Sequence, residues 1–377
     1  MRQKICILYG DLTLASIYIL SDYGKLSKKD ETIVFSQPDG TSTILFPFKT
    51  EHLVIVGKIS ISADALRLLT KYKIGTTFLS SNGKFTGKLS FGESKNIFLR
   101  QKQFRILDDE IKSLEIAKSI VAGKIRNEIS FMQRIKRKGN FEEVQIENSI
   151  ATIKNILVNV EKSENIEKLR GYEGLAARKY FQVFGFNIQP EWAEFKTRSK
   201  NPPKTNVNAV LSFLYSLLMY RVESAIESQG LDICAGNLHA LNYGKSALVF
   251  DLMEEFRTPI ADSVCCNLFN MGTLKEDDFE QVNFSVDDND FPLEQNNNIP
   301  DTTEDSELFE KTKNGILLTK NGIKKVISAF ENKLDTLIFY SPTNQKISYA
   351  KIIYEQVIHY KRVILGEEKE YKAYFFK

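Results

Sequence analysis

The sequence predicts an α+β protein in which a small, N-terminal, mostly antiparallel β domain precedes a larger, all-α catalytic domain. Up to about residue 90, short β-branched and aromatic runs alternate with turn signals such as DYGK and PDGT, as in a sheet. From about residue 95 the apolar residues recur every three or four positions, as on one face of a helix. We therefore expect a β domain over residues 1–92 and a helical domain over residues 93–377.

The first domain contains several strand candidates and one helix candidate, SADALRLLTKY. The strand candidates are ICILY, SIYIL, ETIVFS, STILFPF, EHLVIVG, TTFLSS and FTGKLSF. SIYIL and STILFPF are candidates for exposed sheet edges. Edge strands have unpaired backbone groups, and a two-fold dimer is the commonest way to pair them, so we expect a homodimer formed through this domain.

Amphipathic helices are expected to fill the second domain. Residues 95–138 predict one or two long helices with many basic side chains. The run RSKNPPKTN marks a break, because paired prolines cannot lie inside a helix. Further helices are expected at about 147–161, 164–184, 207–228, 247–270, 319–334 and 347–363.

Composition places the chain among ordinary globular proteins. Of its 377 residues 42% are hydrophobic and 26% charged, and no run approaches the ~18–20 uncharged apolar residues of a membrane span. The N-terminus lacks a signal-peptide cleavage pattern, and the four cysteines form no C-x-x-C zinc motif. We expect a cytoplasmic protein without membrane contact.

Charge is distributed unevenly along the chain. Residues 276–307 contain 12 of the 48 Asp and Glu and none of the 51 Lys and Arg, so the rest of the chain is strongly basic and suits a polyanionic partner. The acidic segment itself is polar and aperiodic, which predicts a flexible loop. Its role is open between a solvated loop and an internal competitor for DNA.

The stretch SALVFDLMEEFR places two carboxylates beside an apolar helix face. Asp251 and Glu254 are three residues apart and share a face with Ala247. His239, in AGNLHALNYGKS, precedes them by a short loop that could fold back onto them. Imidazole and carboxylates suit Mn²⁺ or Mg²⁺, whereas the alternatives are a solvated acidic edge and a structural histidine.

A second carboxylate, Glu173 in LRGYEGLAARKYF, falls on an apolar helix face. Burial of a carboxylate is costly without a cation or hydrogen-bond donors. Gly171 and Gly174 flank it, and helix glycines suggest that a ligand or another backbone approaches closely. The alternative is a core glutamate paired with Arg170 or Arg178.

Several common catalytic motifs are absent from the sequence. GNLHALNYGKS ends like a phosphate-binding P-loop, but His239 stands where the first glycine is required. H-E-x-x-H, G-x-S-x-G and the dinucleotide fingerprint are also missing, which argues against those enzyme classes.

Taken together, GYEGLAARKYF, PPKTNVNAVLSFLYSLL, AGNLH and SALVFDLMEEFRTPIAD resemble, in order and spacing, the CRISPR-associated adaptation integrases. The resemblance extends to N-terminal segments such as FLSSNGKFTGKL and to the C-terminal ISYAKIIYEQVIHYKRVILG. Thr205 and Asn206 stand where relatives often have Asp and Pro, which puts the local turn in doubt.

The resemblance implies an enzyme with a divalent metal, Mg²⁺ or Mn²⁺. It would insert new spacers into a CRISPR array by attack of a 3′-hydroxyl on repeat phosphodiesters, or cut DNA with water as nucleophile. It assigns the metal ligands to Glu173, His239 and Glu254, with Asp251 lining the same catalytic site. No nucleotide cofactor is needed, because one phosphodiester replaces another.

The implied partners are double-stranded DNA (prespacer and CRISPR repeat), a second copy of the chain and a small ferredoxin-like CRISPR-associated protein. The basic helices of 95–138 are candidate backbone clamps. Further candidate DNA contacts are Lys196, Arg198, Lys200, Lys204 and Arg257. Two alternatives remain at this point, a non-catalytic nucleic-acid-binding adaptor and a repair nuclease acting on branched DNA.

Overall fold

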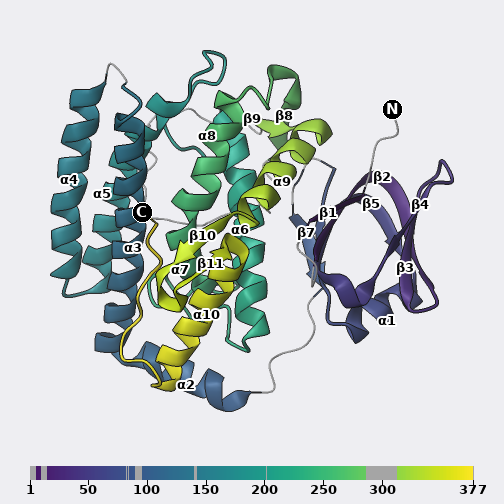
Figure 1. Ribbon diagram of the computed structural model, residues 1–377, viewed down its shortest axis with the longest axis horizontal. Helices are drawn as coiled ribbons and strands as arrows, with labels where there is room; N and C mark the ends of the chain where they lie inside the picture. The colour runs from purple at the N-terminus through teal and green to yellow at the C-terminus, as the bar shows by residue number, and fades with distance from the viewer. Residues whose placement is uncertain are drawn as a thin grey trace.

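The computed structural model describes residues 6–9, 15–81, 83, 85–89, 96–139, 142–200, 202–285 and 312–376. A twisted sheet with one helix forms the N-terminal part, and a larger helical body follows it (Figure 1). The α+β prediction is confirmed. The predicted boundary at residue 92 lies outside the described residues.

The N-terminal sheet is mixed, although most of its pairings are antiparallel. Its strand order is β4-β3-β2-β5-β6-β7, with β1 also pairing with β2. The pairs β2–β5 and β5–β6 are parallel, the second because α1 crosses over between the two strands. The elements are β1 (Cys6–Tyr9), β2 (Ala15–Lys29), β3 (Thr32–Ser36), β4 (Ser42–Leu45), β5 (Thr50–Ile61), α1 (Ala63–Lys71), β6 (Gly75–Leu79) and β7 (Phe85–Leu89).

Alternation along the central strands divides the sheet between two cores. Ile17 and Ile19 of β2 pack into a core formed with α1, whereas Tyr18 and Leu20 on the opposite face join the core of the helical body. Because both faces of the sheet are covered here, all five residues of SIYIL are buried. SIYIL lies in β2, in the middle of the sheet, so its prediction as an edge strand is wrong. STILFPF contains β4, which lies at one end of the strand order.

The helical body contains the helices that the periodicity predicts, and several begin at side-chain caps. Asn165 and Thr205, for example, accept hydrogen bonds from Lys168 N and Asn208 N. Thr205 thus starts its helix although it replaces the Asp of relatives. The helices are α2 (Ile97–Asp108), α3 (Glu110–Lys136), α4 (Glu143–Glu161), α5 (Ile166–Phe184), α6 (Asn206–Ser228), α7 (Ala247–Phe256), α8 (Ser263–Asn270), α9 (Lys320–Leu334) and α10 (Tyr349–Leu365).

Among the described residues, α6 is the one helix that is long and apolar enough to cross a membrane by length and composition. Most of it is buried inside the protein, and it lies centrally in the helical body (Figure 1). These are also the properties of a core helix.

The predicted helix 247–270 is interrupted by a π-helical turn, Arg257–Asp262, which lies between α7 and α8. Pro259 within this turn has no N–H to donate to the carbonyl of Glu255, four residues earlier. The Nδ2 atom of Asn127 on α3 donates to that carbonyl instead, at 2.8 Å. The proline thus opens α7 to a contact from the neighbouring helix.

The acidic segment is not a flexible loop throughout. Within it, Phe279–Ser285 form strand β8, which pairs antiparallel with β9 (Thr312–Leu318). Asp278, which is buried, pairs with Lys325 and so ties this hairpin to α9. The rest of the segment, residues 286–307, lies outside the described residues. A second hairpin, β10 (Leu337–Tyr340) with β11 (Gln345–Ser348), also departs from an all-α second domain.

The C-terminal segment returns to α3, where the chain end lies in Figure 1. The main chain of Tyr374 and Phe376 bonds with the amide of Asn127, and Ala373 N donates to Ser119 Oγ. Gly123 permits this approach, because a Cβ there would lie 2.4 Å from the Cβ of Ala373. α3, α7 and the C-terminus are therefore held as one unit.

We expect Asn127→Ala to lower the free energy of unfolding by about 3 kcal/mol. The buried amide makes three hydrogen bonds, at 2.8–3.0 Å, and its loss leaves backbone groups of α7 and the C-terminus without partners. Asn155→Ala, at an exposed position on α4, is the control and should change stability by less than ~0.5 kcal/mol. Urea unfolding measures both, and equal effects would contradict the role given to Asn127.

Candidate active site

The acidic pair on α7 is buried. Asp251 and Glu254 are 0% and 1% exposed, so the interpretation as a solvated acidic edge is wrong. Two carboxylates in a protein interior require compensating donors or cations. The neighbouring elements supply both.

Asp251 fastens the loop that carries His239. Its carboxylate accepts hydrogen bonds from the backbone N–H groups of Asn237, Leu238 and His239 and from Nδ1 of the His239 ring, at 2.7 Å. Gly236 lies so close that a Cβ there would be 2.7 Å from a carboxylate oxygen of Asp251. With both oxygens engaged, Asp251 acts as a positioning residue in this arrangement.

His239 presents its other ring nitrogen to Glu254. Because Asp251 accepts from Nδ1, we assign the ring proton to Nδ1, which leaves the lone pair of Nε2 available to a ligand. Nε2 lies 3.8 Å from Oε1 of Glu254. Arg170 on α5 donates to the carbonyl of Leu238 at 2.6 Å and so holds the same loop from the other side.

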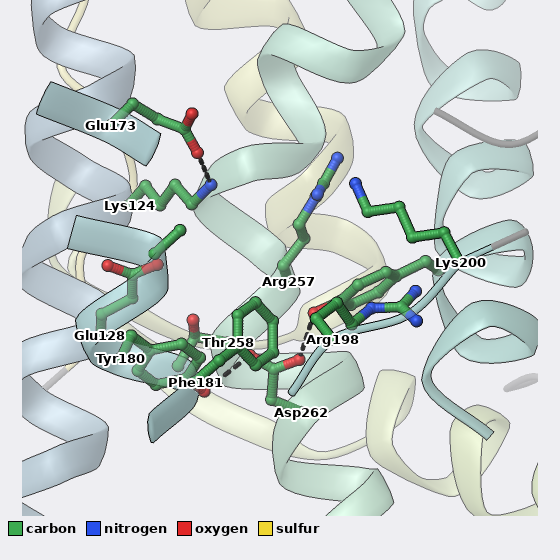
Figure 2. A pocket seen from close by; sticks show the side chains of 12 residues that line it. Lys124, Glu128, Glu173, Tyr180, Phe181, Arg198, Lys200, Arg257, Thr258 and Asp262 are labelled. Carbon is green, nitrogen blue, oxygen red and sulfur yellow. Dashed lines mark hydrogen bonds and ion pairs between the residues drawn. The ribbon is translucent and has the colours of Figure 1, made fainter. Parts of the chain in front are cut away.

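Glu173 on α5 pairs with Lys124 of α3, and not with Arg170 or Arg178 (Figure 2). The ammonium of Lys124 also lies 2.8 Å from Oε2 of Glu254, so one buried cation joins the two carboxylates. Burial alone would lower the pKa of Lys124, but the surrounding carboxylates, Glu173 foremost, raise it above its ordinary value.

Sequence reasoning does not single out Lys124. It counts this lysine among the basic side chains of 95–138 that are candidate DNA clamps. It is buried, and its charge is engaged inside the protein. The available signal was its position four residues after Ile120 and four before Glu128, on a helix face that is otherwise buried.

Of the two approaches expected at the glycines beside Glu173, that of another backbone is wrong for Gly171. A Cβ at that position would meet nothing within 4 Å, so no backbone approaches closely there. Gly174 is buried within α5.

A pocket lies next to the carboxylates, with acidic and basic walls (Figure 2). Asp262 at its base accepts hydrogen bonds from the hydroxyls of Tyr180 and Tyr215, at 2.7 and 2.6 Å. The guanidinium groups of Arg198 and Arg257 lie over the Tyr215 ring, 5.4 and 5.1 Å from its centroid. The lining residues are Lys124, Glu128, Glu173, Ala177, Tyr180, Phe181, Arg198, Lys200, Tyr215, Arg257, Thr258 and Asp262.

The candidate DNA contacts separate into two groups. Arg198, Lys200 and Arg257 line the pocket, and Arg257 also pairs with Glu254 at 3.1 Å. Lys196 and Lys204 are exposed outside it, and Lys196 pairs with Glu194. A negatively charged ligand in the pocket would therefore meet these three cations in addition to Lys124.

The predicted ligands Glu173, His239 and Glu254 come from α5, a loop and α7. Lys124 bridges Glu173 and Glu254, and Nε2 of His239 lies 3.8 Å from the other oxygen of Glu254. Carboxylate oxygens and imidazole nitrogen are the donors that Mn²⁺ and Mg²⁺ accept. Within the described ranges, no three His, Cys, Asp or Glu side chains are close enough together to hold an ion as they stand. The ammonium of Lys124 accounts for the spacing, because it lies between Glu173 and Glu254. The donor set fits a divalent cation at this position.

The sequence profile of the family described as CRISPR associated protein Cas1 matches residues 17–286. The chain belongs to the Cas1 family. It is 30% identical to CRISPR-associated endonuclease Cas1 3 of Thermus thermophilus over 95% of this chain and 96% of that one. It is 32% identical to the CRISPR-associated endonuclease Cas1 of Leptospira interrogans over 74% of this chain and 100% of the relative.

Solved structures show the same fold. The Cas1 protein TM1797 of Thermotoga maritima superposes with a TM-score of 0.75 at 22% identity, covering 95% of this chain and 99% of that one. A casposase bound to an integration product superposes with a TM-score of 0.76 at 20% identity, covering 97% and 95% of the two chains. With the Cas1 relatives, these findings make the chain a CRISPR-associated nuclease.

Glu128, which lines the pocket, generates a pH prediction. Burial, opposed by the charge of Lys124, raises the pKa of its carboxyl from 4.5 to about 8. The folded state then binds more protons than the unfolded state between these values, so this group makes stability fall as pH rises from about 4.5 to 8. We expect Glu128→Gln to reduce that fall, measured by urea unfolding across this range. Unchanged slopes would contradict the shift.

Proposed function

We propose that this protein is a divalent-metal-dependent DNA endonuclease and integrase that joins the 3′ end of a prespacer to a CRISPR repeat. The observation that carries the proposal is a chain of contacts: the buried ammonium of Lys124 bridges Glu173 and Glu254, and Nε2 of His239 lies 3.8 Å from the other oxygen of Glu254. A non-catalytic adaptor gives no reason to bury such a set, because even a compensated buried ion pair is often no more stabilising than apolar residues of similar volume.

Each group in the site has a distinct part in the proposed reaction. Glu173, Nε2 of His239 and Glu254 would hold Mn²⁺ or Mg²⁺, while Asp251 keeps the His239 ring in the required tautomer. When bound, the metal neutralises phosphate charge and favours the deprotonated form of the attacking hydroxyl. Arg198, Lys200 and Arg257 would bind the phosphate from the opposite wall of the pocket.

The covalent step exchanges one phosphodiester for another. The 3′-oxygen of the prespacer forms a bond to a repeat phosphorus, and the existing bond from that phosphorus to the 3′-oxygen of the neighbouring nucleotide breaks. The proton leaves the attacking hydroxyl and the departing oxygen gains one, so no nucleotide cofactor is required. With water as nucleophile, the same geometry gives endonuclease cleavage.

Partner proteins are proposed from related structures. One is a Cas6-RT-Cas1--Cas2 complex with a TM-score of 0.77 at 20% identity, covering 97% of this chain and 36% of that one. We propose that this chain also acts on DNA together with a small ferredoxin-like CRISPR-associated protein, in the cytoplasm where a CRISPR array resides. A role in repair of branched DNA would be separated from spacer acquisition by the genes beside this one.

Chemistry and DNA binding should separate in mutants. We expect Glu173→Ala, His239→Ala and Glu254→Ala each to reduce strand transfer with Mn²⁺ at least ~100-fold. DNA affinity should change little, because the basic residues of the pocket and the surface are left intact. Glu167→Ala, at an exposed position on α5, is the matched control and should retain full activity. Wild-type rates in any of the three ligand variants would refute the metal assignment.

Dimerisation through the sheet domain is a separate proposal. β4 ends the described sheet order, and Ile44, Phe46 and Phe48 at this edge are about half exposed. We expect a dimer in sedimentation velocity at micromolar concentration, and a shift towards monomer in Phe46→Ser/Phe48→Ser. A monomeric wild-type protein would exclude the dimer.

A further inference from the structure

We propose that Lys124 is an internal counter-ion that holds the metal ligands in the absence of metal, and that its ammonium moves to Glu128 when a divalent ion binds. The inference rests on the proposed function, because it concerns the same three ligands. It adds two residues, one cationic and one acidic, to a site that the sequence motifs define without them.

The starting position follows from the contacts of Lys124. Its Nζ bonds to Glu173 and lies 2.8 Å from Oε2 of Glu254, and it is enclosed in the protein interior. A divalent ion takes carboxylate oxygens at ~2.0–2.6 Å. An ammonium bonded to the same two carboxylates would lie within ~4 Å of that ion, where two positive charges repel strongly in a partly desolvated site. The ion and the ammonium therefore compete for one position.

Glu128 provides a second position for the ammonium. It follows Lys124 by four residues on α3, the spacing at which two side chains on a helix lie side by side. The side chain is 2% exposed, and its Oε2 has no hydrogen-bond partner among the described residues. Both side chains line the pocket (Figure 2). A change of rotamer at Lys124 would thus satisfy a buried oxygen without moving the backbone.

The arrangement makes metal binding an exchange of cations. Without metal, the ammonium keeps Glu173 and Glu254 compensated and therefore keeps α3, α5 and α7 together. With metal, the positive charge of Lys124 is retained in the pocket and is paired with Glu128. Since the ligands are engaged beforehand, the apparent metal affinity is lower than the same three ligands would otherwise give.

The test is calorimetric titration of the full-length protein with Mn²⁺, in the absence of DNA. We expect Lys124→Met to tighten Mn²⁺ binding by about tenfold, because the competitor is gone. We also expect it to lower the melting temperature without metal and to show a larger stabilisation by saturating Mn²⁺ than the wild type. Lys118→Met, which removes a lysine of α3 paired with Glu115, is the control for charge and should leave the affinity within about twofold.

A double-mutant cycle separates exchange from simple electrostatics. In the wild-type background, Glu128→Gln should weaken Mn²⁺ binding severalfold, because the ammonium loses its second position. In the Lys124→Met background the same substitution should have no effect. Equal effects in both backgrounds, or unchanged affinity in Lys124→Met, would overturn the inference. If Lys124→Met does not fold, Lys124→Gln takes its place in the cycle with the same expectations.

The same titrations keep this inference apart from the proposed function. If His239→Ala binds Mn²⁺ like the wild type, or the wild type does not bind it, the ligand assignment fails and this inference fails with it. If the wild type binds Mn²⁺ through His239 but the cycle shows no coupling between Lys124 and Glu128, the proposed function stands and the exchange is excluded.

Discussion

The ammonium of Lys124 between the carboxylates of Glu173 and Glu254 is the interaction on which the catalytic half of this structure depends. It joins α3, α5 and α7 at a point from which water is largely removed. Without a cation there, two carboxylates would repel across a medium of low polarity, and separation of the helices would relieve the repulsion. The site is therefore also a structural element, which explains how a ligand set with this much negative charge is compatible with a packed core.

Around this point, polar contacts restrict each ligand to a narrow range of positions. Asp251 and Arg170 hold the loop of His239 from two sides. Behind α7, the side chain of Glu255 accepts from Tyr371, from Gln356 and from the main chain of Tyr374, so the chain terminus braces the helix that carries Glu254. Burial nevertheless raises the pKa of Glu255 to about 7 despite these donors. The proposed metal ligands are thus preorganised, which would reduce the entropy lost on binding an ion.

A second buried ion pair, within the helical body, receives a tyrosine hydroxyl of the sheet domain and so helps to join the two parts. Arg221 on α6 donates to both oxygens of Glu331 on α9, at 2.6 and 2.7 Å, and Tyr18 of β2 donates to Glu331 at 2.5 Å. Lys88 of β7 pairs with Glu223 of α6 at 2.5 Å. Because Tyr18 also packs into the core of the helical body, this contact combines apolar burial with directed hydrogen bonds and orients the sheet relative to the site.

The amino-acid sequence by itself determined the α+β class and the order of helices and most strands, and it predicted Glu173, His239 and Glu254 as a group of metal ligands. These features depend on local periodicity, on caps and breaks such as Thr205 and the paired prolines, or on motifs in order along the chain. Tertiary structure alone decided the central position of SIYIL in the sheet, the hairpin formed by part of the acidic segment, and the role of Lys124. The reason is physical, since each of these depends on partners distant in sequence. A lysine on a basic amphipathic helix has the same local pattern whether it faces water or a buried pair of carboxylates, and only the packing of α3 against α5 and α7 distinguishes the two.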